Sequence, residues 1–206
     1  MVVDPPLKGE WVILNPPGHP KLALDLLATK GSRLPYRGAT FLRHLFGSIA
    51  VEETYAWSQP VLAPLDGVVV ACSDGTPDRE RISMIRDLVT LLLLPPKPGS
   101  PFAAYGGNYV ILKCGDKYPL MAHLRCGSVP VKVGDSVLAG DQLGEVGNSG
   151  SSLQPHLHFQ VMNSENPFPL FRNLVPFTFR EVRKRVGREW KTLSNAELSN
   201  GDHLRL

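Results

Sequence analysis

The sequence predicts an all-β domain of antiparallel strands with one helical insertion. Its 19 glycines and 19 prolines among 206 residues favour a turn-rich chain over a helix bundle. Hydrophobic residues make up 43% and charged residues 20%, which excludes a disordered chain and supports a buried core. Short apolar runs recur between Gly, Asp and Pro turns, as in β-sandwiches and barrels. The length suits one domain with an extension.

Most strands are predicted from apolar runs bounded by turn residues. We expect strands in the runs 11–15, 22–28, 108–114, 118–124, 128–133, 136–147 and 156–162. The run PVLAPLDGVVVACSDG, which starts at Pro60, predicts a hairpin because Asp66-Gly67 is a strong turn dipeptide. Residues 31–58 predict a long loop with a short helix around Phe41 to Phe46.

The helical insertion is expected at about 78–93. Thr76 and Pro77 are typical of an N-cap and a first helical position, and Pro95-Pro96 would end the helix. Five apolar residues at three- and four-residue spacing form one stripe: Ile82, Ile85, Leu88, Val89 and Leu92. This stripe favours a helix packed on the sheet over a lid, a partner surface or a membrane-surface helix.

Charge and cysteine content exclude several classes of protein. Twenty-two basic and nineteen acidic residues give a net charge of +3, with no basic stripe, so a nucleic-acid partner is not expected. Cys72, Cys114 and Cys126 lack metal-site spacing and are odd in number, so neither a disulfide framework nor a cysteine zinc site is expected. The basic segment after Arg180 is interpreted as a solvated face.

The expected localisation follows from the absence of a signal-peptide pattern in the first residues. The N-terminal stretch shows no basic region followed by an apolar core, so the default expectation is cytoplasmic. A trimmed signal would instead make the protein periplasmic or extracellular. The longest apolar stretch, 88–94, is far short of the roughly 20 residues that span a bilayer.

The motif His156-Leu157-His158 carries the first sign of chemistry. Because side chains alternate along a strand, both imidazoles are expected on one face. Buried imidazoles need hydrogen-bond partners or a metal. On this motif alone, a metal or catalytic pair and two exposed edge histidines remain equally open.

The residues around this motif favour a metal site over exposed edge histidines. The run GSVPVKVGDSVLAGDQLGEVGNSGSSLQPHLHFQV, preceded by YPLMAHL, resembles lysostaphin/LytM-type zinc metallopeptidases, which cleave peptide cross-links in bacterial cell walls. The resemblance covers roughly 60–162. It implies a two-layer antiparallel sheet with a groove like that of barrel-sandwich hybrids. We therefore expect a metallopeptidase-like β domain over 1–179 and a C-terminal extension over 180–206.

The resemblance also implies a ligand set. It places a zinc ligand on His158 and the non-ligand catalytic pair on His123 and His156. For the upstream histidine and aspartate, the candidates are His19 and Asp25, whose even separation could put both on one strand face.

Three further residues are considered for the site. His44 is the rival upstream ligand, with Glu52 or Glu53 as its carboxylate. Asn108, which matches a recurrent family asparagine, is interpreted as structural. His203 is considered only as a distant candidate for a fourth ligand.

Two imidazoles and one carboxylate are typical of catalytic Zn²⁺, which keeps one position for water. Together with this chemistry, the resemblance implies a zinc endopeptidase acting on Gly- or Ala-containing peptides such as peptidoglycan cross-links. We expect proton transfer by His156, and either oxyanion stabilisation or shared proton transfer by His123.

Two alternatives keep the fold. APLDGVV and VKVGDSVLAGDQLGEV also resemble lipoyl, biotinyl and phosphotransferase carrier domains, although Lys117 lies outside the expected hairpin. The second alternative is a pseudo-enzyme that binds a partner through the same groove. Bound zinc would exclude the carriers.

Overall fold

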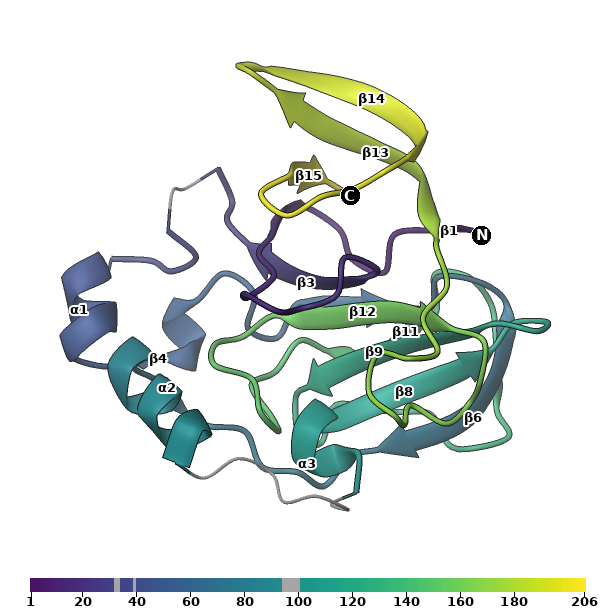
Figure 1. The fold of residues 1–206 in the computed structure, drawn as a ribbon, viewed down its shortest axis with the longest axis horizontal. Coiled ribbons are helices and arrows are strands. Elements are labelled where there is room, and N and C mark those ends of the chain that lie inside the picture. Colours follow the sequence, from purple (N-terminus) through teal and green to yellow (C-terminus); the bar gives the residue numbers. More distant parts are fainter. Residues whose placement is uncertain (32–33, 39, 94–100) are drawn as a thin grey trace.

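The computed structural model describes residues 1–31, 34–38, 40–93 and 101–206, and it confirms the all-β prediction (Figure 1). One large sheet has the strand order β1-β13-β15-β2-β3-β12-β9-β8-β6-β10, and β14 pairs with β13. β1 runs parallel to β13, whereas the other pairs are antiparallel. The bounds are β1 Val2–Val3, β2 Glu10–Ile13, β3 Ala23–Ala28, β6 Gly67–Ser73, β8 Asn108–Lys113, β9 Tyr118–Leu124, β10 Ser136–Val137, β12 Leu157–Met162, β13 Thr178–Val186, β14 Glu189–Ala196 and β15 His203–Arg205.

Shorter elements surround this sheet. Two strand pairs lie apart from it, β5 (Pro60–Leu62) with β11 (Gln142–Glu145) and β4 (Ile49–Ala50) with β7 (Arg81–Ile82). The helical elements are α1 Phe41–Phe46, the 3₁₀ turn η1 Val51–Glu53, α2 Met84–Leu93 and α3 Ala103–Gly106.

The centre of the sheet is buried on both faces. Every residue of β3 and of β12 is buried, which explains their nearly continuous apolar sequences. One face carries the main core, which includes Trp11, Leu26 and Phe159 and is closed by Val61 and Leu143 of the β5–β11 pair. The opposite face carries the polar residues of β3 and β12 described below.

Most of the predicted strands are confirmed, but 128–133 is not a strand. Pro130 has no N–H to donate to a strand ladder. Val129 and Val131 instead pack on the main core from irregular backbone. Within 136–147, two short strands, β10 and β11, replace one run.

The hairpin predicted across Asp66-Gly67 is wrong. β5 pairs with β11, while β6 pairs with β8 and β10. Gly67 begins β6, where a Cβ atom would lie 2.7 Å from the carbonyl oxygen of Lys113. Asp66 accepts a hydrogen bond from the Ala139 backbone at 2.7 Å. The glycine is therefore needed for close strand packing, and non-local pairing outweighs the local turn preference.

The predicted helix start is also wrong, because α2 begins at Met84. Thr76 donates its backbone N–H to Asn108, and Asp78 accepts from the backbones of Cys126 and Asn148 at 2.8 and 2.6 Å. These polar side chains tie 76–78 to distant loops instead of capping a helix. Pro95-Pro96 lie outside the described residues.

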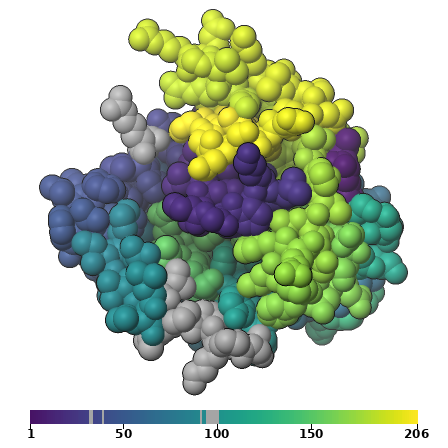
Figure 2. All heavy atoms as spheres, in the orientation of Figure 1, coloured from purple at the N-terminus to yellow at the C-terminus, as the bar shows by residue number. Residues whose placement is uncertain are grey.

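The apolar stripe of α2 is not packed on the sheet, contrary to expectation. Ile82 is buried in β7, but the other four residues are 44–71% exposed: Ile85, Leu88, Val89 and Leu92. Together with α1, α2 forms a projecting part of the surface in Figure 2. Among the described residues, no helix has the length and apolar character that a membrane crossing requires.

The C-terminal residues extend the same sheet. β13 runs across the expected boundary at 179/180, and β14 folds back on it as a hairpin (Figure 1). β15 then lies between β13 and β2, so the last strand pairs with one of the first. In the sheet, β15 is thus separated from β3 by one strand, β2, whereas β1 lies at the edge beyond β13.

Candidate metal centre

The structure brings together three of the residues singled out in the sequence. His19, Asp25 and His158 each offer a ligand atom, and these atoms lie within 4.8 Å of one another. Asp25 of β3 and His158 of β12 are direct cross-strand partners, and His158 Nδ1 lies 2.8 Å from Asp25 Oδ1. His19, in the loop before β3, places Nε2 3.6 Å from the same oxygen.

Asn15 folds the His19 loop back onto β3. Its side-chain amide donates to the carbonyl of Ala23 at 2.8 Å, and its Oδ1 accepts from the Asp25 backbone at 3.0 Å. These two hydrogen bonds hold the loop that carries His19 against β3, next to Asp25. Sequence reasoning missed Asn15, although an asparagine before Pro-Pro is a typical turn-forming residue.

Hydrogen bonds fix which imidazole nitrogens face the cluster. His19 Nδ1–H donates to the Pro20 carbonyl at 3.2 Å, so Nε2 keeps its lone pair. His158 Nε2–H donates to Gln160 Oε1 at 3.0 Å, so Nδ1 keeps its lone pair toward Asp25. Gln160 was not singled out in the sequence, although its even spacing from His158 on a strand puts it on the same face.

This donor set fits a zinc ion. His19 Nε2 is buried and has no hydrogen-bond partner among the described residues. A lone pair and a carboxylate oxygen at short range repel each other unless a cation or proton lies between them. Two imidazoles, one carboxylate and outer hydrogen bonds to the imidazoles match the ligands of catalytic zinc.

His123 and His156 lie beside these three residues. His156 Nδ1–H donates to the Gln154 carbonyl at 2.8 Å, and His123 Nδ1–H donates to the Ser149 carbonyl at 3.0 Å. Their rings are 4.7 Å apart, and His156 Nε2 lies 3.5 Å from Asp25 Oδ1. Both imidazoles therefore keep Nε2 available to exchange a proton.

A β-bulge aims His123 at the cluster. Asn108 pairs with Leu124 and Tyr109 pairs with Ala122, so His123 is the extra residue of β9. Its φ of 63° lies in the left-handed region, which is strained for a non-glycine residue. The bulge re-aims a side chain that a regular strand would not present in this direction.

The turn 147–150 holds His123 in place. Gly147 donates to the His123 carbonyl at 2.9 Å. Gly107 and Gly150, both at positive φ, pack so closely that a Cβ on Gly150 would lie 2.3 Å from the nitrogen of Gly107. Glycine is required at both positions because no side chain fits between β8 and this turn.

Asn108 is structural, as predicted. It is fully buried, and its side chain bonds the backbone of Thr76 and the carbonyl of Leu124. Leu124 follows His123, so these bonds support the bulge.

The pKa values reflect burial and mutual charge. Burial lowers the pKa of His19 and lowers that of His123 well below its usual value, with His156 and His158 adding to the effect on His123. Burial alone would raise the pKa of Asp25, but the facing His156 and His158 hold it well below its usual value. Burial opposes protonation of His156, yet the charge and hydrogen bond of Asp25 raise its pKa.

The other polar candidates lie apart from this cluster. His44 of α1 is buried 5.3 Å from the Tyr36 ring and is not part of the ligand group. His203 lies in β15 opposite Val12. Lys117, the alternative carrier lysine, pairs with Asp116 at the turn between β8 and β9.

The comparison of sequences shows a similarity to one peptidase family. Residues 97–169 match peptidase family M23, and this stretch contains His123, His156 and His158. This stretch of the chain is therefore similar to M23 peptidases. His19 and Asp25 lie before the matched residues and join the cluster only through the fold.

Two curated proteins are similar to parts of this chain. The peptidoglycan DD-endopeptidase ShyA of Vibrio cholerae is 29% identical over 84 residues, which cover 41% of this chain and 19% of ShyA. Lysostaphin of Staphylococcus simulans is 35% identical over 75 residues, which cover 33% of this chain and 15% of lysostaphin. The matched part thus spans about a fifth or less of these relatives.

Among solved structures, the catalytic domain of lysostaphin from Staphylococcus simulans is similar at 21% identity and a TM-score of 0.41. That match covers 79% of this chain and 90% of the domain.

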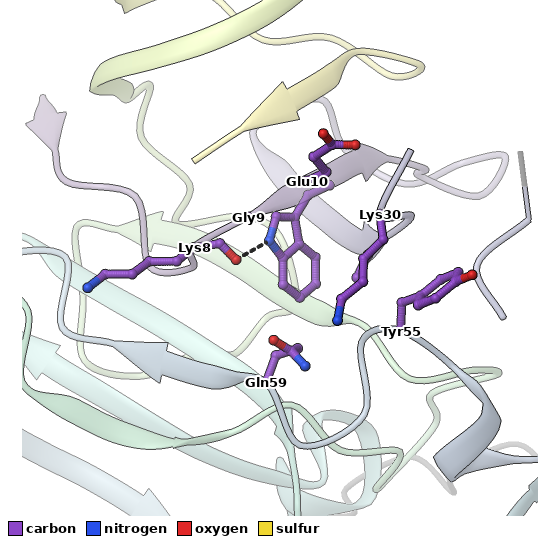
Figure 3. Close-up of a pocket in the computed structure, with 8 residues that line it drawn as sticks. Lys8, Gly9, Glu10, Lys30, Tyr55 and Gln59 are labelled. Carbon is purple, nitrogen blue, oxygen red and sulfur yellow. Dashed lines mark hydrogen bonds between the residues drawn. The ribbon is translucent and has the colours of Figure 1, made fainter. Parts of the chain in front are cut away.

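A separate pocket of about 320 Å³ lies away from the histidine cluster. Figure 3 shows Lys30, Tyr55 and Gln59, which line this pocket together with Trp11. The indole N–H of Trp11 donates to the Lys8 carbonyl at 3.0 Å. Ala28 lines this pocket and lies three residues from Asp25, so the two side chains face opposite sides of β3. The pocket is therefore not part of the histidine cluster.

Proposed function

We propose that this chain is a zinc-dependent endopeptidase that hydrolyses Gly- or Ala-containing peptide bonds, such as those of peptidoglycan cross-links. The observation that carries the proposal is the convergence of His19 Nε2, Asp25 Oδ1 and His158 Nδ1 beside a second histidine pair. The names of two similar proteins, the peptidoglycan DD-endopeptidases ShyA and ShyB of Vibrio cholerae, support peptidoglycan as the substrate class.

His19, Asp25 and His158 would hold the metal, each for a distinct reason. The two imidazoles are locked by Pro20 and Gln160 with a lone pair directed inward. Asp25 remains a carboxylate because its pKa is held well below the usual value. Bound zinc would polarise the scissile carbonyl and lower the pKa of a water molecule.

The second histidine pair would move protons. His156 is suited to accept a proton at Nε2 and pass it to the leaving amine, because Gln154 fixes its Nδ1–H and its Nε2 lies next to the ligand set. His123, held by Ser149, is suited to stabilise the developing oxyanion. These roles are among those predicted from the sequence for His156 and His123.

Product mapping tests this function. Cross-linked peptidoglycan fragments and Gly- and Ala-containing peptides are incubated with zinc-loaded protein, and products are identified by mass spectrometry. We expect new amino termini from wild type, and at least about a 100-fold loss in rate for His123→Ala and His156→Ala with zinc retained.

Matched controls make the result decisive. His203→Ala removes a histidine from β15, outside the cluster, and should cleave at the wild-type rate. Zinc-loaded wild type that cleaves none of these substrates would contradict the proposal. Cleavage that survives both cluster substitutions would contradict the assigned roles.

A further inference from the structure

The side chain of Phe171 lies over two of the three candidate ligands. Its ring centroid is 5.3 Å from that of His19 and 6.2 Å from that of His158. The residue is nevertheless 41% exposed. Part of the ring therefore contacts the ligand imidazoles, while the rest remains accessible beside the site.

The backbone of Phe171 is unfavourable for a bulky side chain. Arg172 donates its N–H to the Pro169 carbonyl at 3.1 Å, closing a turn in which Phe171 is the third residue. Its φ of 64° is one that glycine or asparagine adopts readily and that an aromatic residue rarely adopts. Such strain is concentrated at functional sites, because elsewhere a glycine would be more stable.

The surrounding loop fixes this position. Asn163 donates to the Asn173 carbonyl at 2.9 Å, which closes the base of the loop next to β12. Phe168 packs edge-on against Phe102 and Tyr105, with ring centroids 6.0 Å away in both cases. Phe171 is therefore presented to the site by an anchored loop.

We propose that Phe171 is the apolar wall of the substrate cleft and selects an alanine side chain next to the scissile bond. This inference rests on the proposed function. A carbonyl that reaches the ligand atoms brings its neighbouring Cα atoms within about 4 Å. The Phe171 ring, 5–6 Å from two ligand rings, then meets the side chain of a residue that flanks the bond. A phenyl surface favours a methyl group over a charged side chain.

The test compares two matched peptides, with alanine or glycine beside the scissile bond, on wild type, Phe171→Gly and Phe171→Leu. We expect the KM for the alanine peptide to rise about fourfold in Phe171→Gly, the value of one buried methyl group, and the glycine peptide to change less than about twofold. Phe171→Leu should restore most of the difference, because it retains an apolar surface.

Stability and zinc affinity separate this role from a structural one. Phe171→Gly removes the strained φ, so the metal-free variant should unfold at the wild-type temperature or higher. Its zinc affinity should stay within about threefold of wild type. Lys30→Gly, at a φ of 44° and away from the cluster, controls for relief of backbone strain, and Phe41→Ala controls for loss of an exposed ring.

Three results would overturn the inference. A lower unfolding temperature for Phe171→Gly would make the ring a packing element. A tenfold weaker zinc affinity with equal losses on both peptides would make it a support for His19. A wild type that binds no zinc and cleaves neither peptide would contradict the proposed function, and with it the proposed role of Phe171.

Discussion

Replacing Gln160 with leucine should weaken zinc binding without removing a ligand. Gln160 is 3% exposed, and its Oε1 accepts the Nε2–H of His158 at 3.0 Å. Gln160→Leu leaves this buried donor without its partner and frees the ring to change tautomer. Loss of such an outer contact costs about 10- to 100-fold in metal affinity, or about 1.4–2.8 kcal/mol.

Competition with a chromophoric chelator measures this affinity directly. Gln160→Glu keeps an acceptor for His158 and should bind zinc more tightly than Gln160→Leu. Gln154→Leu is the matched control, because Gln154 contacts His156 through its backbone carbonyl and should change affinity less than about twofold. If folded Gln160→Leu binds zinc as tightly as wild type, the orientation of His158 by Gln160 is refuted.

Three further predictions concern the scaffold. Asn108→Ala removes three side-chain hydrogen bonds, one of them buried, and should lower the free energy of unfolding by about 3 kcal/mol, measured by urea denaturation; a loss under about 1 kcal/mol would contradict the bonds described. Burial lowers the pKa of His44, against the opposing charge of Asp87, so its contribution to stability is complete above pH about 6.5 and is lost as the pH falls through its folded-state pKa. Metal-free wild type should therefore lose more stability between pH 7.5 and 5.5 than His44→Leu, and equal losses would argue against a buried neutral imidazole. Leu92 is 71% exposed, so Leu92→Glu should change the free energy of unfolding by less than about 0.5 kcal/mol; a loss above about 2 kcal/mol would show that the side chain is packed.

The His-x-His geometry could be predicted because it depends only on strand periodicity. His156 immediately precedes β12 and His158 lies in it, and their spacing of two residues directs both imidazoles toward Asp25. The prediction of His19 with Asp25 rests on the family resemblance, on ligand chemistry and on order along the chain. The side chains of His19 and Asp25 come together because the hydrogen bonds of Asn15 fold the loop back onto β3. These bonds join residues that are 8 and 10 positions apart in the sequence.

Features set by distant contacts could not be predicted. The bulge that aims His123 depends on the pairing of β8 with β9, and the left-handed Phe171 depends on a loop anchored to α3. The same applies to the errors in the fold. Asp66-Gly67 has a strong local preference for a hairpin, but the close contact of Gly67 with Lys113 determines the structure.

The zinc content of purified protein tests the central claim most directly. Elemental analysis after zinc loading and dialysis is compared for wild type, His158→Ala and His203→Ala. The three-residue site predicts about one zinc per chain in wild type and His203→Ala, and its loss in His158→Ala. Wild type without zinc, or His158→Ala that retains one zinc per chain, would contradict a metal centre formed by His19, Asp25 and His158.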